Sequence, residues 1–236
     1  YDVALPVLED FGITAFWMVY SSSLLGTCER LELYRYYRTV KFSHTIDFYE
    51  NFYTTIKEDE VYKNVLEAIE NFNPKSYLQE YSFYSDQDRE FRYIRDNVID
   101  TQTYFKIMDK MLEDSGIKTE KLIKKLWMDN TCIQNLHNKN HQIGLHTHSH
   151  PTRVDLLPES EQLKEYKTNF MHLSELINQP IKAMSHPCNR YNKKTLELLK
   201  KLGIVIGFRA NLEQKKYTSL ECPRNDHMHI LKMIPL

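Results

Sequence analysis

Hydrophobic positions follow two different spacings along this chain, and the spacing changes twice. Residues 3–10 form a helical pattern, and residues 13–20, ITAFWMVY, have the β-branched and aromatic composition of a buried strand. From residue 24 to 125, aromatic and aliphatic side chains recur every three or four positions, which predicts amphipathic helices. After residue 126 short apolar runs alternate with helical patterns. The sequence therefore predicts an α/β fold with a parallel sheet and a mostly helical insertion at 24–125.

The elements predicted after residue 126 place two polar segments at the ends of strands. The predicted helices are 129–139, 158–177 and 193–202, and the predicted strands are 142–145, 181–185 and 204–208. Segments 146–150 and 186–191 directly follow the first two of these strands. Ligands of parallel sheets and βα barrels bind at the carboxyl ends of the strands, so these segments are the candidate site.

The amino-acid composition argues against several classes of protein. The 236 residues are 42% hydrophobic, which is enough for the core of a single domain, 1–236, with the insertion inside it. The net charge of −1 predicts no affinity for nucleic acid, and no apolar run approaches the roughly 20 residues of a transmembrane helix. The four cysteines form no CxxC pair, which argues against a zinc ribbon and a disulfide framework.

The segment HTHSHP, residues 146–151, holds three of the ten histidines at alternating positions. Histidine is the commonest metal-binding side chain. Side chains four residues apart face the same way in a strand and lie one turn apart in a helix, so His146 and His150 can bind one ion under either geometry. The alternative is a solvated polar loop that is rich in histidine. The position behind a predicted strand favours the metal site.

Three stretches of the chain resemble the polysaccharide deacetylases, which are NodB-homology carbohydrate esterases of family four. They are residues 4–17, 143–151 and 185–192, and the resemblance is most specific at HTHSHP. It covers residues 1–20 and 126–236. The resemblance implies a distorted (β/α) barrel, and the helical segment between the two parts resembles an insertion carried by one branch of the family.

The same resemblance implies removal of an N-acetyl group from an amino sugar of a polysaccharide, surface glycan or glycan precursor. His146 and His150 would bind a divalent ion, most often zinc and sometimes cobalt or nickel, and His148 is expected to point away. Such an ion lowers the pKa of its bound water to about 7 and polarises the acetyl carbonyl. A carboxylate base, a general acid and backbone N–H groups at the oxyanion complete the chemistry.

Two further segments carry candidate roles by this resemblance. In 185–191 the family's tyrosine–glycine pair is replaced; the backbone N–H of Cys188 is the candidate oxyanion donor, and the substrate-binding candidates are His186, Pro187 and Tyr191. A Cys188 nucleophile with His186 as its base is disfavoured, because two residues so close in the chain are poorly placed for an orienting hydrogen bond.

Near the C-terminus, His227 beside Asp226 is the candidate general acid, with His229 as the alternate. Arg224 is a candidate for orienting a carboxylate or binding the substrate. The alternative for this segment is a surface turn before a terminal helix.

The family's Asp-Asp motif, which provides the general base and the third metal ligand, would fall just before Tyr1. We therefore expect the first strand and these aspartates upstream of the given sequence; a truncated, inactive form is the alternative. Three functions stay open: a metal-dependent N-deacetylase, a catalytically inactive carbohydrate-binding or scaffolding protein of the same fold, and a hydrolase of another amide or ester. The insertion is a candidate surface for homo-oligomer formation, and localisation, cytoplasmic or at the cell envelope of a bacterium, is not encoded in a visible signal.

Overall fold

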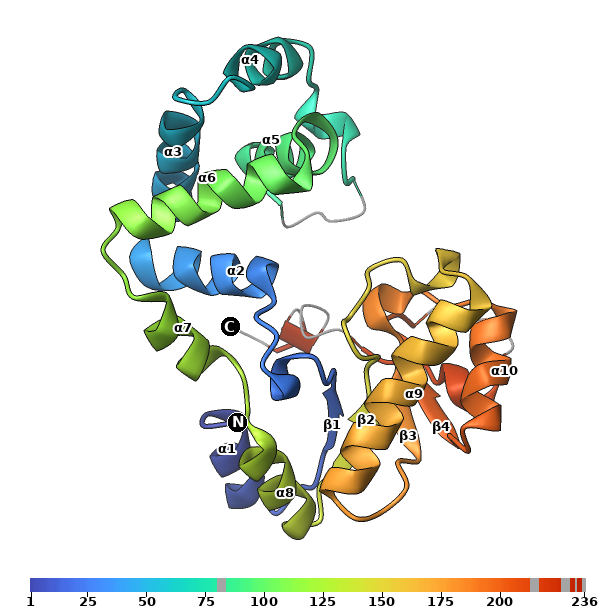
Figure 1. Ribbon diagram of the computed structural model, residues 1–236. Helices are drawn as coiled ribbons and strands as arrows, with labels where there is room; N and C mark the ends of the chain where they lie inside the picture. Colours follow the sequence, from blue (N-terminus) through green and yellow to red (C-terminus); the bar gives the residue numbers. More distant parts are fainter. Residues whose placement is uncertain (80–83, 213–216, 226–229, 232, 235–236) are drawn as a thin grey trace. The chain divides into compact units, whose positions relative to one another are not determined.

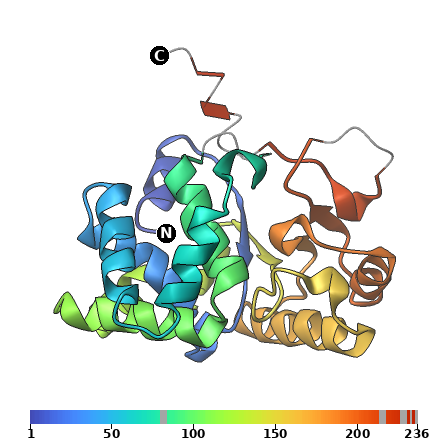
Figure 2. The same ribbon diagram turned by 90° about the horizontal axis from the view of Figure 1, so that it is seen from above.

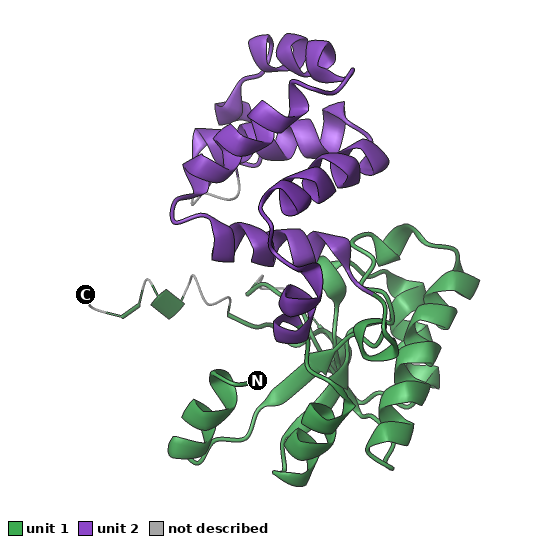
Figure 3. Cartoon of the chain, turned by 60° about the vertical axis from the view of Figure 1, so that its left-hand side comes forward, with its two compact units in different colours: residues 1–27, 127–236 green, residues 28–126 purple. Residues whose placement is uncertain are grey.

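The chain divides into two compact units in the computed structural model, which describes residues 1–79, 84–212, 217–225, 230–231 and 233–234 (Figure 1). Unit 1 consists of residues 1–27 and 127–236, and unit 2 consists of residues 28–126 (Figure 3). The insertion predicted from the sequence spans 24–125, so the compact helical unit begins a few residues later and ends one residue later. Each unit is described by itself.

Unit 1 is an α/β structure in which helices alternate with parallel strands. Its helices are α1 (Ala4–Asp10), α8 (Asn130–Asn138), α9 (Glu159–Leu176) and α10 (Lys193–Lys201), and its strands are β1 (Phe16–Val19), β2 (Gln142–Leu145), β3 (Ala183–Ser185) and β4 (Ile206–Phe208). The strands form a parallel sheet in the order β1-β2-β3-β4. Strands that neighbour each other in chain order are the arrangement of a (β/α) barrel wall, so the predicted fold class is confirmed.

Local sequence signals set the helix boundaries of unit 1. The Asp129 carboxylate accepts a hydrogen bond from the Cys132 amide at 2.8 Å and caps the start of α8. Asn192 caps α10 in the same way, through the Thr195 amide at 3.1 Å. Gly203 follows α10 with a φ of +80°, a left-handed conformation that costs glycine least.

The strands are shorter and less buried than the sequence predicts. The predicted buried strand 13–20 contains only the four residues of β1, and the Phe16 and Ile13 side chains are 47% and 53% exposed. The physical reason is that β1 lies at the edge of the four-stranded sheet formed by the described residues. Similarly β4 begins at Ile206, and Val205 before it is 58% exposed.

The register of the sheet aligns the carboxyl ends of neighbouring strands. Val19 of β1 pairs with Leu145 of β2, and Ser185 of β3 pairs with Phe208 of β4. Helices α8 and α9 pack against β2, as Figure 1 shows for α9. The apolar core lies between the sheet and these helices: Leu5, Val19, Ile133, Leu136, Ile143, Leu145, Val154, Tyr166, Leu173, Ile181, Met184, Leu199, Ile204 and Leu220.

Unit 2 is helical, as its spacing predicts. Its helices are α2 (Arg30–Lys41), α3 (Thr45–Ile56), α4 (Tyr62–Glu70), α5 (Asp86–Tyr93), α6 (Thr101–Asp114) and α7 (Thr119–Leu126), with a π-helical turn at Ile94–Val98. Helix α3 packs against α5 and α6 (Figures 1 and 2). Phe48, Phe52 and Phe91 are each at most 4% exposed, so these aromatic residues form the unit's own core rather than a sugar-binding surface. Among the described helices, none combines the length and apolar character needed to cross a bilayer.

Candidate metal and substrate site

Two histidine rings face each other directly after β2. The ring centroids of His146 and His150 lie 4.8 Å apart, with their planes at 47°. The loop coils back on itself because Thr147 and His150 have φ values of +63° and +55°. Positive φ is uncommon for residues other than glycine, and it concentrates at functional sites. The two side chains singled out by the sequence are therefore close together at the carboxyl end of a parallel strand.

A hydrogen bond to β3 determines which nitrogen of His146 is available. Its Nδ1 lies 2.9 Å from the Ser185 carbonyl oxygen and 2.9 Å from the Ser185 hydroxyl. A carbonyl oxygen only accepts, so Nδ1 carries the hydrogen and Nε2 keeps its lone pair. Metal-binding histidines are oriented by this kind of bond from the other ring nitrogen.

Electrostatics also keep His146 in the neutral form that binds metal. The pKa of His146 is lowered to about 4, chiefly by burial and also by electrostatic interactions with His150, Arg224 and His186, against the opposing effect of the Ser185 hydrogen bond. At neutral pH the imidazole is therefore uncharged, and no proton has to leave before a cation binds.

Two polar side chains of helix α9 hold residues 146–150, which we call the histidine loop. The Glu165 carboxylate accepts hydrogen bonds from the backbone amides of His148 at 2.9 Å and Ser149 at 2.8 Å, and from the Ser149 hydroxyl at 2.7 Å. The Asn169 side chain accepts from the His146 amide at 3.0 Å. Sequence reasoning did not identify either residue. The sequence contained one sign of this role for Asn169: a polar amide side chain on the buried face of a predicted amphipathic helix.

The middle histidine is bound separately from the pair. Nδ1 of His148 and the Ser21 hydroxyl form a 3.0 Å hydrogen bond, and the Ser22 amide donates to the His148 carbonyl at 2.9 Å. Ser21 and Ser22 follow β1, so these bonds tie the loop to the neighbouring strand. His148 is thus hydrogen-bonded to residues that follow β1.

The pair fits two ligand positions of a divalent metal. Neutral imidazole nitrogens suit zinc, cobalt and nickel. Within residues 1–79, 84–212, 217–225, 230–231 and 233–234, no three His, Cys, Asp or Glu side chains are grouped closely enough to hold an ion. His146 and His150 are therefore two candidate ligands within the described residues.

One protein-family model matches part of this chain. The model of the family described as polysaccharide deacetylase matches residues 96–207, which include the histidine loop, α9 and β3. Residues 96–207 of this chain thus resemble the polysaccharide deacetylases. No curated protein has a sequence that matches this chain significantly.

Solved structures with a similar arrangement include deacetylases and an inactive relative. The BpsB deacetylase domain from Bordetella bronchiseptica is 12% identical with a TM-score of 0.38, over 42% of this chain and 49% of that one. The deacetylase PplD from Streptococcus pyogenes is 15% identical with a TM-score of 0.40, over 72% and 92%. BA3943 from Bacillus anthracis, a CE4 family pseudoenzyme, is 13% identical with a TM-score of 0.31, over 40% and 34%. The chain thus spans about half the length of the BpsB domain.

The second polar segment, residues 186–191, is held by contacts within itself and with residues 220–221. His186 is 3% exposed, its ring stacks on Tyr191 with centroids 4.0 Å apart, and its Nε2 donates to the Leu220 carbonyl at 2.8 Å. The Tyr191 hydroxyl donates to the Glu221 carboxylate at 3.0 Å. The bond to the Leu220 carbonyl leaves the lone pair on Nδ1 of His186, which is buried, whereas the Cys188 side chain is exposed. Contact of His186 and Tyr191 with substrate stays a prediction.

The structure describes only some of the remaining candidate site residues. Pro187 is buried and Cys188 is exposed with a φ of +49°, in a 3-10 turn at Pro187–Asn189. Arg224 is near enough for its charge to act on the pKa of His146. Asp226, His227 and His229 lie outside the described residues. The roles proposed for these six residues stay predictions.

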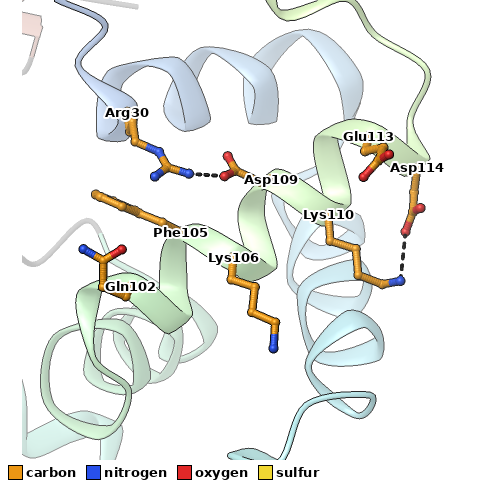
Figure 4. A pocket seen from close by; sticks show the side chains of 8 residues that line it. All are labelled: Arg30, Gln102, Phe105, Lys106, Asp109, Lys110, Glu113 and Asp114. Atoms are coloured by element: carbon orange, nitrogen blue, oxygen red, sulfur yellow. Dashed lines mark hydrogen bonds and ion pairs between the residues drawn. The ribbon is translucent and has the colours of Figure 1, made fainter.

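A hollow in unit 2 is a weaker candidate for a ligand site. It has a volume of about 520 Å³ and lies along α6, with Arg30, Phe105 and Asp109 among its lining residues (Figure 4). Its cations are already paired: Arg30 with Asp109, Lys106 with Asp59 and Lys110 with Glu58. A charged ligand would have to compete with these carboxylates.

We expect Glu165→Ala to weaken zinc binding about tenfold, in the range typical for residues that support metal ligands. The substitution removes the acceptor of three hydrogen bonds in the histidine loop, so the loop becomes free to move His150 away from His146. Competition with a chromophoric chelator measures the dissociation constant. The matched control is Glu161→Ala, one turn earlier on the exposed side of α9; equal losses in the two variants would contradict the role of Glu165.

The buried histidines predict a loss of stability on acidification. Burial is the main cause that lowers the pKa of His146 and of His186 to about 4, below the ordinary value of about 6.5. Between these pH values the unfolded chain binds protons that the folded chain does not. Above pH ~6.5 these two histidines do not reduce the free energy of unfolding. As the pH falls from ~6.5 to ~4, the free energy of unfolding decreases by up to about 1.4 kcal/mol per pH unit for each of the two residues.

Urea unfolding of the metal-free protein at several pH values between 7 and 4 checks this expectation. His186→Gln keeps an N–H donor for the Leu220 carbonyl but does not titrate, so it should reduce the slope by the contribution of one histidine. His44→Gln, at an exposed position in unit 2, is the control. An unchanged slope in His186→Gln would show that His186 does not stay neutral in the folded protein.

Proposed function

We propose that this protein is a metal-dependent hydrolase that removes the N-acetyl group from an amino sugar of a polysaccharide, surface glycan or glycan precursor. The observation that carries the proposal is the facing pair of His146 and His150 at the end of β2, in which the Ser185 carbonyl leaves Nε2 of His146 with its lone pair. The polysaccharide deacetylase family supports deacetylation as the reaction.

The residues of the chain have distinct tasks in this proposal. His146 and His150 hold the ion, which by the chemistry of imidazole ligands is zinc, with cobalt and nickel as alternatives. When bound, such an ion lowers the pKa of water and polarises the acetyl carbonyl. Ser185 orients the His146 ring, and Glu165 and Asn169 hold the backbone of the segment that carries both histidines.

Residues 186–191 and the segment near the C-terminus that contains Arg224, Asp226 and His227 are proposed to act on the substrate. The backbone N–H of Cys188 is the proposed donor to the oxyanion, and His186, Pro187 and Tyr191 are the proposed lining of the sugar site. Asp226 with His227 is proposed to protonate the leaving amine, and Arg224 to orient a carboxylate or the substrate. A general acid of this kind contributes typically 10²–10⁴-fold to a rate, so His227→Ala should slow turnover by roughly that factor while the metal stays bound.

One observation favours a second function, a carbohydrate-binding protein of the same fold without catalysis. The described residues group no third His, Cys, Asp or Glu side chain with the histidine pair. An ion held by two imidazoles alone binds weakly and lacks a neighbouring carboxylate base. The two functions differ in whether acetate is produced.

The deciding experiment measures acetate release by the full-length protein. The metal is removed with a chelator, and zinc, cobalt or nickel is added back before incubation with N-acetylglucosamine oligomers of one to five sugars. We expect acetate only after metal is restored. Release that is unaffected by the chelator would overturn metal dependence. Binding of the oligomers without acetate release under any of the three metals would favour the second function.

A further inference from the structure

Two aromatic side chains that have no part in the proposed reaction lie beside the histidine pair. The ring centroid of Tyr20 is 5.7 Å from that of His150, with the planes at 47°. The indole N–H of Trp127 donates a hydrogen bond to the Tyr20 hydroxyl. Both side chains are half-buried. The two rings and the histidine pair therefore belong to one continuous group of side chains.

The sheet explains why these residues meet. Val19 pairs with Leu145, so Tyr20 and His146 are each the next residue beyond the paired ends of β1 and β2. Tyr20 therefore emerges at the same edge of the sheet as the histidine loop. Trp127 lies three residues before α8, which packs against β2 and brings the indole to this edge.

The hydrogen bond between the two residues gives the aromatic surface a fixed orientation. An indole has one donor, and here it is used by the neighbouring hydroxyl, so the polar edge of Trp127 is turned toward Tyr20. A half-buried ring in this position keeps part of its apolar surface exposed. Binding to a surface that is already ordered avoids the entropic cost of ordering it on contact.

The other tryptophan has a different environment. The Trp17 ring packs edge-on against His141, with centroids 5.9 Å apart, and its Nε1 is buried. The aromatic residues of unit 2 are mostly enclosed in their own core. This contrast makes Trp17 a matched internal control for Trp127.

We propose that Tyr20 and Trp127 form a sugar-binding subsite beside the metal pair, on which a pyranose ring next to the reacting amino sugar stacks. The proposal rests on the proposed function for the class of ligand. Aromatic faces carry partial negative charge, and the C–H groups on a pyranose face are apolar and slightly positive, so the two surfaces attract. Binding sites with mostly aromatic walls and a few polar groups are typical for small ligands. The subsite would make the protein prefer oligomers over single sugars.

Intrinsic fluorescence and kinetics of the full-length protein test this subsite. The probe is the tetramer of N-acetylglucosamine, with the monomer for comparison. We expect the tetramer to change the emission of the wild type and of Trp17→Phe, and not of Trp127→Ala. In Trp127→Ala the KM for the tetramer should rise about tenfold, which corresponds to the roughly 1.4 kcal/mol of one aromatic contact, with kcat changed less than about threefold. The KM for the monomer should stay the same.

A second variant keeps the proposal testable if Trp127→Ala does not fold. Tyr20→Phe removes only the hydroxyl that accepts from the indole, and we expect the KM for the tetramer to rise about threefold, as for the loss of a weak hydrogen bond. Tetramer kinetics that are the same in wild type, Trp127→Ala and Tyr20→Phe would overturn the subsite. Acetate release by the wild type would then still support the proposed function. Trp127-dependent tetramer binding without acetate release would support the subsite and reject the hydrolase.

Discussion

His146→Ala and His150→Ala are each expected to weaken metal binding at least about a hundredfold, more than the 10- to 100-fold typical for loss of a supporting residue. Their rings face each other with centroids 4.8 Å apart, and each is one of the two proposed ligands. Removing either leaves a single imidazole. Metal content after dialysis and isothermal titration with zinc measure the loss, and acetate release should fall in parallel.

The matched control for this pair is His148→Ala. His148 lies between the two residues in the chain, but its Nδ1 is hydrogen-bonded to the Ser21 hydroxyl and its backbone carbonyl to the Ser22 amide. The substitution removes only the side-chain bond, so the metal affinity should change less than about tenfold. Equal losses in all three variants would contradict the assignment of His146 and His150 as the ligands.

The elements of unit 1 were predictable because their signals are local. Asp129 and Asn192 cap α8 and α10, Gly203 follows α10, and each signal lies within a few residues of the boundary that it sets. Strand lengths were predicted less well. Ile181 and Ile204 are buried but lie outside β3 and β4, because apolar residues that flank a strand pack into the core without joining the sheet.

The histidine pair was predictable for a similar reason, whereas its supports were not. The spacing of four residues between His146 and His150 is visible in the sequence. The bonds from Ser185, Glu165 and Asn169 join residues 39, 16 and 23 positions apart in the chain. Such contacts depend on how α9 and β3 lie against β2, which local patterns do not determine.

A second difference concerns residues 186–191. The family resemblance implied that His186 and Tyr191 bind the substrate, in a segment that follows a strand. In the structure the two rings stack on each other, and their polar atoms bind the Leu220 carbonyl and the Glu221 carboxylate. Residues 220 and 221 lie more than 25 positions further along the chain. The sequence identified Tyr20 only as the last residue of a predicted buried strand, and its position beside His150 follows from the pairing of β1 with β2.

Asn169→Ala is expected to lower the free energy of unfolding by about 2–4 kcal/mol, since each buried polar group left without a partner costs about 1–3 kcal/mol. The Asn169 side chain is fully buried, accepts a hydrogen bond from the His146 amide at 3.0 Å and donates one to the Val19 carbonyl at 3.0 Å. It thus joins the ends of β1 and β2 at the point where the histidine loop begins. Its removal should also weaken metal binding, because the backbone of His146 loses its anchor.

Two further variants separate the hydrogen bonds from the volume of the side chain. Asn169→Leu has a similar volume but neither polar group, so it should be destabilised as strongly as Asn169→Ala if the hydrogen bonds dominate. Lys167→Ala, on the exposed side of the same helix, should stay within about 0.5 kcal/mol of the wild type. Urea unfolding of the metal-free proteins measures all three. If Asn169→Leu is as stable as the wild type, packing rather than hydrogen bonding holds the two strand ends together, and its zinc affinity then shows whether the His146 amide needs its anchor.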